Sequence, residues 1–241
     1  MTDEKCKYCY IDFNSKRKIG SRKPDDIQLV IFDMDGVLTD VYSSWRYVHN
    51  FFNTSNDKSV EAYLKGEIDD MEFIRRDATL WRENGKAIKK EKLAEILSDV
   101  HLIKGAKECI GYLKKKDIKT AIVSAGLDIL AERIGKELGI DYVYSNGISA
   151  DENGFLTGYG IIGVKLKAKD ETVKSLAKKI GIVYNNIVAV GNSCFDIPMF
   201  EMAGLGIAFN PDDDCVRKYA DIVIAEKDLK KICPVLEKYI Q

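Results

Sequence analysis

The chain has 241 residues, of which 46% are hydrophobic and 31% are charged, and its 37 basic and 38 acidic residues nearly cancel. This length and composition are typical of a globular protein with a full core. The charge balance favours neither nucleic acid nor a membrane surface as a partner, and no apolar stretch approaches the ~20 residues of a membrane span. Because the N-terminus is too polar for a signal peptide and six cysteines make no disulfide scaffold, we expect a cytoplasmic protein.

Residues 1–26 are polar and basic, and Pro24 interrupts them. We interpret them as an extension with little capacity for a core of its own. Cys6 and Cys9 form half of a zinc knuckle, whereas a structural zinc site needs four ligands. An extension without metal is the favoured interpretation, and a zinc ion shared by two chains is the alternative. The oligomeric state is therefore left open, with a dimer among the possibilities.

The next part of the chain alternates short apolar runs with helical periodicity. Apolar residues recur at 106, 109, 110 and 113, and again at 173, 176, 177 and 180, as on one face of a helix. Continuously apolar runs are typical of strands buried on both faces. We therefore predict an α/β fold, a doubly wound (Rossmann-like) parallel sheet. The predicted strands are Leu29–Phe32, Ala121–Val123, Ile187–Val190, Ile207–Phe209 and Ile222–Ile224.

Two segments interrupt the alternation. Residues 43–102 show no good strand, and their helical patterns predict a helical cap inserted after the first strand, over its carboxyl end. The core domain then comprises residues 27–42 and 103–241. Residues 148–164, which hold four glycines, are interpreted as a β-hairpin or an extended excursion. The predicted cap helices are Trp45–Phe52, Ser59–Lys65, Met71–Arg82 and Glu91–Val100.

Polar side chains follow the predicted strands. In a doubly wound sheet, ligands bind outside the carboxyl ends of the strands. Asp33 and Asp35 follow the first strand, Ser124 follows the second, and a Gly-Asn-x-x-x-Asp run that ends at Asp196 follows the third. Carboxylate and amide oxygens suit a hard cation or acid–base chemistry, and a hydroxyl can donate to phosphate. Lys169 opens the preceding helix.

These residues resemble the four motifs of the haloacid dehalogenase-like hydrolase superfamily. The first, Asp-x-Asp, is matched by Asp33-Met34-Asp35-Gly36-Val37-Leu38-Thr39, and a strand-ending serine is matched by Ser124. The lysine is matched by Lys169, and the acidic pair corresponds to Gly191-Asn192-Ser193-Cys194-Phe195-Asp196. The resemblance covers residues 27 to about 240. The sequence pattern around Ala168–Val173 and Val188–Phe209 is most similar to that of the phosphoserine phosphatases.

The resemblance implies a phosphatase that hydrolyses a small phosphorylated metabolite through a phosphoaspartyl intermediate. Asp33 would be the nucleophile and Asp35 the general acid and base. Ser124, Ala125 and Lys169 would hold the phosphoryl oxygens. Mg²⁺ would be the cofactor, bound by the Asp33 carboxylate, the Asp35 carbonyl and the side chain of residue 192. Asp196 would orient Lys169 or a water on the metal.

The sequence departs from the family pattern at two places. Asn192 replaces the usual aspartate, and an uncharged amide should bind Mg²⁺ more weakly. Tyr42 stands where phosphoserine phosphatases carry a glutamate for the substrate's amino group, and Arg75 and Arg76 fall near the cap arginine that binds the carboxylate. Phosphoserine is therefore the leading named substrate, with a sugar phosphate or another phosphorylated acid close behind. A catalytically weakened member that binds a ligand or a partner is the competing hypothesis.

Simpler interpretations remain for several residues. Ser124 and Asp196 could each be a helix N-cap. Lys169 lies in a lysine-rich run, where Lys167 is the alternative phosphate ligand. Cys194 is interpreted as a buried bystander, and His49 is expected to belong to the cap and not to a metal site.

Overall fold

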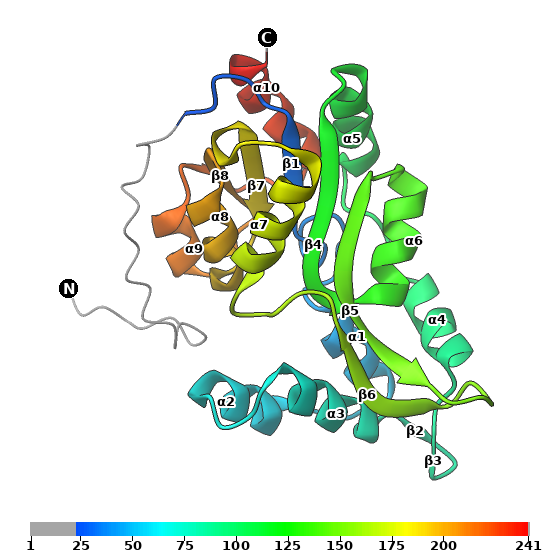
Figure 1. Cartoon of the computed structure of the whole chain (residues 1–241). Helices are drawn as coiled ribbons and strands as arrows, with labels where there is room; N and C mark the ends of the chain where they lie inside the picture. Colours follow the sequence, from blue (N-terminus) through cyan, green and yellow to red (C-terminus); the bar gives the residue numbers. More distant parts are fainter. Residues whose placement is uncertain (1–22, 241) are drawn as a thin grey trace.

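The computed structural model describes residues 23–240, so Cys6 and Cys9 lie outside the described residues (Figure 1). Its main feature is a seven-stranded sheet in the order β6-β5-β4-β1-β7-β8-β9. Neighbouring strands are parallel except for the β5–β6 pair at one edge. The strands are β1 (Leu29–Phe32), β4 (Lys119–Leu127), β5 (Tyr142–Ala150), β6 (Leu156–Ile162), β7 (Ile187–Gly191), β8 (Leu205–Phe209) and β9 (Ile222–Ile224).

Helices cover both faces of this sheet, because alternate residues of its central strands point in opposite directions. Val30 and Phe32 of β1 belong to the core cluster shared with α5 (Ala106–Lys115) and α6 (Asp128–Leu138). Leu29 and Ile31 belong to the cluster on the other face, packed with α7 (Lys169–Ile180), α8 (Ile197–Met202) and α9 (Asp214–Tyr219). The remaining helix of the core is α10 (Cys233–Leu236). The predicted doubly wound fold is confirmed.

The cap follows β1 along the chain. It contains α1 (Ser44–Phe51), α2 (Asp57–Lys65), α3 (Asp70–Leu80) and α4 (Lys90–Ser98). An isolated bridge between Thr39 and Leu102 joins the two connections near the core. The expectation of an all-helical insert was wrong in one detail, since Arg82–Glu83 (β2) and Lys86–Ala87 (β3) form a small antiparallel hairpin. Figure 1 shows α2 and α3 in the lower part of the molecule, with α3 next to β6.

The predicted β-hairpin is present, but its first strand begins at Tyr142 and not at Ile148. The first half of β5, Tyr142–Ser145, is half-buried throughout and contains two tyrosines and a serine, so it has no continuous aliphatic run to reveal it. The hairpin turns at Gly154, whose φ is +82°, and the Asp151 carboxylate accepts from the Asn153 and Phe155 amides. Strand β6 then packs along α3, so the hairpin supports the cap as well as the sheet edge.

Short 3₁₀ turns complete the described chain at Tyr184–Asn186, Cys194–Asp196, Leu229–Ile232 and Glu237–Tyr239. Within residues 23–240, no helix has both the length and the apolar character needed to cross a bilayer.

Candidate active site

The strand order explains why the motif residues meet. Strand β1 pairs with β4 on one side and β7 on the other, so the carboxyl ends of all three strands adjoin. The Asp33 amide continues this pairing by donating to the Val190 carbonyl at 2.9 Å. The chain then turns sharply, with the amides of residues 37–39 donating to the Met34 carbonyl. The turn passes through Gly36 at φ +76°, a conformation that favours glycine.

Lys169 joins two of the predicted acids in the interior. Its Nζ lies 3.0 Å from Asp33 Oδ1 and 2.7 Å from Asp196 Oδ1, and Lys169 and Asp196 are only 2% and 0% exposed. Burial lowers the pKa of Lys169, but attraction to Asp196 and Asp33 outweighs it, so the net shift is upward. Burial raises the pKa of Asp33, and Lys169 opposes that shift. The ammonium is therefore a permanent positive charge beside Asp33.

Asp196 stands at the N-cap position of α8, but its side chain makes no capping hydrogen bond to that helix. Its Oδ2 accepts from the Asn192 and Ser193 amides at 2.9 and 3.0 Å, while its Oδ1 holds Lys169. This single carboxylate therefore fixes both the loop after β7 and the lysine. Removing it would leave Lys169 bound to Asp33 alone.

Asp35 carries the pKa shift best suited to proton transfer. Its Oδ2 accepts from the Ser44 amide and from Ser44 Oγ, both at 2.8 Å. Its buried Oδ1 has no hydrogen-bond partner among the described residues. Burial raises the pKa of Asp35 to about 7, against the hydrogen bonds from Ser44. The carboxyl group can thus be protonated or ionised near neutral pH, with one oxygen available to a ligand.

Ser124 and Ala125 line the same cavity from the end of β4. Ser124 is not an N-cap, because α6 begins at Asp128, and its hydroxyl accepts from the Gly126 amide at 3.1 Å. A hydrogen bond from Ser124 also lowers the pKa of Asp33. The Ala125 carbonyl accepts from Trp45 Nε1 at 3.0 Å, which ties this loop to the cap.

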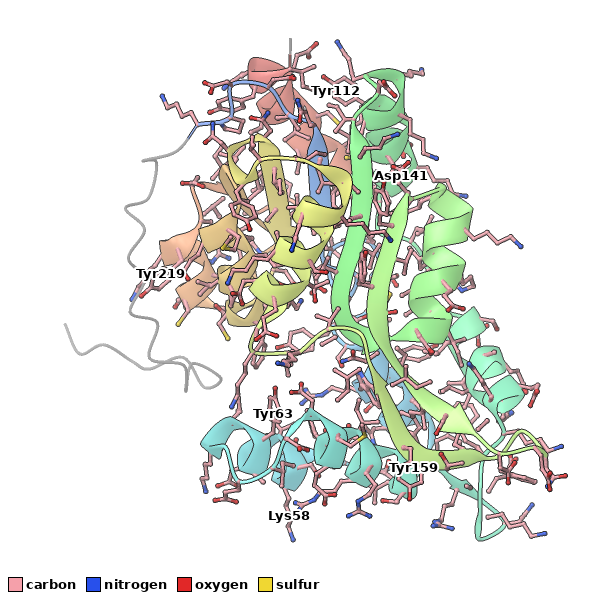
Figure 2. All side chains as sticks on the ribbon, in the orientation of Figure 1. Lys58, Tyr63, Tyr112, Asp141, Tyr159 and Tyr219 are labelled. Atoms are coloured by element: carbon pink, nitrogen blue, oxygen red, sulfur yellow. The ribbon has the colours of Figure 1, made fainter. Side chains whose placement is uncertain are left out.

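The site opens into a cavity of about 190 Å³ between core and cap. Figure 2 shows Tyr63, one of the cavity residues, on the side of α2 that faces the core, whereas Lys58 points away. The cavity is large enough for a small phosphorylated metabolite, and its far wall is mostly apolar. The apolar and aromatic lining residues are Trp45, Val60, Tyr63, Leu64, Phe73, Ile74, Leu166 and Phe195.

The predicted substrate residues are only partly in place. Tyr42 lines the cavity, but Arg75 and Arg76 do not, and both bind Glu72 on the outer surface at 2.6 and 2.8 Å. The reason is the helical period: α3 turns residues 70, 73, 74 and 77 toward the cavity, and residues 72, 75 and 76 lie on another face. Apart from Lys169, the one cation that lines the cavity within the described chain is Arg46.

The alternatives to the motif residues are also located. Lys167 Nζ donates to the Tyr63 and Leu64 carbonyls, so it supports α2 and does not line the cavity. His49 lies in α1, where its Nδ1 accepts from Trp81 Nε1 at 3.2 Å. It belongs to the cap, as expected. Cys194 is fully buried, also as expected.

The site residues that were missed from the sequence include Ser44, Arg46 and Asp212. The first two begin α1, and the pair Ser43-Ser44 is itself a helix-start signal. Asp212 lies at the cavity rim, after β8. Partial burial raises the pKa of Asp212 to about 6, although the hydrogen bond from Asn192 lowers it.

The residues around Asp33 fit a magnesium ion through mixed oxygen donors. Among residues 23–240, no group of three His, Cys, Asp or Glu side chains is arranged to hold a metal. The set here instead combines the Asp33 carboxylate with the Asn192 amide oxygen and the Asp35 carbonyl, which are hard oxygen ligands. Asn192 is 2% exposed and lines the cavity, and a Cβ at Gly36 would collide with its Nδ2. The glycine thus lets the amide approach the Asp33 loop.

A doubly wound sheet with two aspartates after its first strand and a lysine–aspartate pair beside them defines a class of hydrolases. The model of the haloacid dehalogenase-like hydrolase family matches residues 27–204, and the chain belongs to this family. It is 35% identical over 214 residues to a phosphoserine phosphatase of Archaeoglobus fulgidus, covering 87% of this chain and 60% of that protein. It is 31% identical to the Methanocaldococcus jannaschii phosphoserine phosphatase, over 89% of this chain and 98% of that protein.

Comparison with solved structures gives the same family. The structure of a phosphoaspartyl intermediate analogue of phosphoserine phosphatase superposes with a TM-score of 0.73 at 30% identity, covering 90% of this chain and 100% of that one. A substrate-bound phosphoserine phosphatase gives the same TM-score and identity. The predicted family, its phosphoserine phosphatase-like branch and the enzyme class, a phosphoric monoester hydrolase, are confirmed.

Proposed function

We propose that the protein is a Mg²⁺-dependent phosphatase of small phosphorylated metabolites and that Asp33 is its nucleophile. The observation that carries this proposal is the buried cluster of Asp33, Lys169 and Asp196 at the base of the cavity, with Asp35 beside it. A permanent cation next to a carboxylate suits the attack of that carboxylate on a dianionic phosphate.

The reaction has two half-steps. An oxygen of Asp33 attacks phosphorus and the bond to the substrate's alcohol oxygen breaks, giving an acyl phosphate on Asp33. Asp35 donates its proton to the departing alcohol. A water molecule then attacks the acyl phosphate, Asp35 takes the proton back, and inorganic phosphate leaves with the Asp33 carboxylate restored. Ser124 and Lys169 hold the phosphoryl oxygens throughout.

The pKa of Asp35, raised to about 7 by burial, supports both of its roles. A group that titrates near the working pH is an effective acid in one half-step and an effective base in the next. The two hydrogen bonds from Ser44 hold Oδ2, which leaves Oδ1 for the substrate oxygen and then for water.

We place the magnesium ion among Asp33, the Asp35 carbonyl and the Asn192 amide oxygen. When bound, it supplies positive charge that offsets the repulsion between nucleophile and phosphate. Lys169 supplies a second positive charge, and Asp196 keeps that charge in position.

The substrate class follows from the relatives and from the cavity. The relatives named above are phosphoserine phosphatases, so phosphoserine is the first candidate. Arg46 lines the cavity, and its ion pair with Asp57 is long, at 3.9 Å. We therefore infer that Arg46, in place of Arg75 and Arg76, binds an acidic group of the substrate. Tyr42 offers a phenol but no negative charge to bind the amino group of phosphoserine. A sugar phosphate or another phosphorylated acid therefore stays a candidate substrate.

The decisive experiment measures hydrolysis of para-nitrophenyl phosphate with and without Mg²⁺. We expect turnover that depends on magnesium, is abolished in Asp33→Asn and is unchanged in Asp40→Asn, a matched exposed aspartate. Turnover that survives in Asp33→Asn would contradict the nucleophile assignment. A chain that binds phosphorylated metabolites without hydrolysing them would instead support the weakened, ligand-binding alternative. The cytoplasmic location and the oligomeric state stay predictions.

A further inference from the structure

Chemistry fixes the orientation of the Asn192 side chain. Its Nδ2 donates to Asp212 Oδ2, and the Asp212 amide donates to the Asn192 carbonyl at 2.8 Å. Since only the NH₂ end of an amide can donate to a carboxylate, Oδ1 must point the other way. Asn192 is 2% exposed, and Oδ1 accepts no hydrogen bond from any described residue. An acceptor without a partner among the described residues, on a side chain that lines the cavity, is a position open to a donor or a cation.

Asp212 is also the carboxylate placed to supply the charge that this amide lacks. It lines the cavity and is bound to Asn192 at both the backbone and the side chain. Accepting a hydrogen bond from Nδ2 polarises the amide and increases the negative charge on Oδ1. The pair Asn192–Asp212 therefore presents one oxygen ligand backed by one full negative charge.

We propose that Asp212 is a positioning residue of the magnesium site, which replaces through Asn192 the charge of the family's usual aspartate. This inference rests on the proposed magnesium site and adds a residue and a mechanism to it. Outer partners of metal ligands typically change metal affinity about 10- to 100-fold. The negative charge that an aspartate at position 192 would carry is then not lost from the site but is carried by Asp212.

The neighbouring acids have other tasks. Asp213 caps α9, since its Oδ1 accepts from the Val216 amide at 2.7 Å and its Oδ2 accepts from the Cys194 amide at 2.6 Å. The Asp214 side chain is 92% exposed and lies 3.9 Å from Arg217. Asp214→Asn is therefore a matched control, because it makes the same change of charge two residues away without touching Asn192.

The test is the affinity of the full chain for Mg²⁺ alone, measured by isothermal titration calorimetry without substrate. We expect Asp212→Asn to weaken binding about 10- to 100-fold and Asp214→Asn to leave it unchanged. Circular dichroism and thermal unfolding in chelator verify that both variants fold. Unchanged affinity in a folded Asp212→Asn variant, beside a wild-type chain that binds Mg²⁺, overturns this inference and leaves the proposed function intact. A wild-type chain that binds no Mg²⁺ overturns the metal site itself.

A double-mutant cycle separates this role from a general effect of charge. In an Asn192→Asp background the charge lies on the ligand itself, and two adjacent carboxylates repel each other. We expect Asp212→Asn to stop weakening Mg²⁺ binding there, and the double variant to bind at least as tightly as Asn192→Asp alone. Equal weakening in both backgrounds would show that Asp212 acts only through the overall field, which contradicts a role through the amide.

Discussion

The two sides of the cavity hold their charged groups in different ways. On the core side, Lys169 and Asp196 are 2% and 0% exposed, and short ion pairs fix them. On the cap side, the Arg46 side chain is 46% exposed, and its one ion pair, with Asp57, is 3.9 Å long. The conformation of a buried, fully paired side chain is fixed before substrate binds, whereas an exposed arginine can change its conformation to fit the group that it binds. Under the proposed function, this difference would separate the chemistry, carried by the core side, from substrate selection, carried by the cap side.

The largest effect is expected where the core side is broken. Lys169→Met leaves Asp33 and Asp196 as buried carboxylates without their cation, which should cost about 3 to 5 kcal/mol of unfolding free energy. It should also lower kcat on the order of 10³-fold through loss of phosphate stabilisation. Urea unfolding and steady-state kinetics measure the two effects. Lys167→Met is the control and should keep most of the activity, so equal losses in the two variants would refute the distinction drawn between these lysines.

Asp35→Asn should have the next largest effect, lowering kcat about 10²- to 10⁴-fold by removing the proton carrier. It also has a stability signature. Because the folded-state pKa is raised from 3.8 to about 7, the folded chain binds the extra proton and loses stability as pH rises through this window. In chelator, the variant should therefore gain stability over wild type at pH 8 but not at pH 3. A difference that does not change with pH would contradict the shifted pKa.

A smaller and more selective effect is expected on the cap side. Arg46→Ala should raise KM about 10-fold for the preferred metabolite by removing a charge-assisted hydrogen bond. It should leave para-nitrophenyl phosphate unaffected, since that compound has no second acidic group. Arg75→Ala and Arg76→Ala should leave KM unchanged for both the metabolite and para-nitrophenyl phosphate, because both side chains bind Glu72 away from the cavity. A larger increase of KM in these variants than in Arg46→Ala would mean that Arg75 or Arg76 of α3, and not Arg46, contacts the substrate.

The smallest effect is expected at the contact between the two sides. Trp45→Phe removes the hydrogen bond from Nε1 to the Ala125 carbonyl and keeps an aromatic ring in place. Loss of this bond should lower the free energy of unfolding by about 1 kcal/mol. Urea unfolding of the variant measures it. An unchanged midpoint would mean that the bond contributes nothing to the joining of cap and core.

Much of the core side could be predicted from the sequence, because its residues follow buried strands at short, regular spacing. The apolar run Leu29–Phe32 matches β1 residue for residue, and the strand order then brings Asp33, Ser124 and Asn192 together. Lys169 could be preferred over Lys167 only by resemblance, since both fit the lysine-rich run. The structure gives the physical reason, because Lys169 points into the core and Lys167 reaches carbonyls of α2.

The cap side was predicted less well, because its contacts join residues far apart in the chain. The Arg75-Arg76 pair stood out in the sequence, but the phase of α3 turns both away from the cavity. Arg46 lies in an ordinary amphipathic segment, and nothing in the sequence distinguishes it. Asp212 lies in a run of three aspartates that is more typical of a solvated loop. Only its contact with Asn192, 20 residues earlier, reveals a role.

Ser44 ties the first helix of the cap to Asp35 in the core. It opens α1 and donates two hydrogen bonds to Asp35, while its hydroxyl also accepts at 3.0 Å from the amide of Leu127, the last residue of β4. Any movement that lifts this end of α1 off the core must either drag the Asp35 carboxylate with it or release it. Under the proposed function, a displacement of this end of α1 would therefore disturb both the wall of the cavity and the position of the proton-carrying carboxylate.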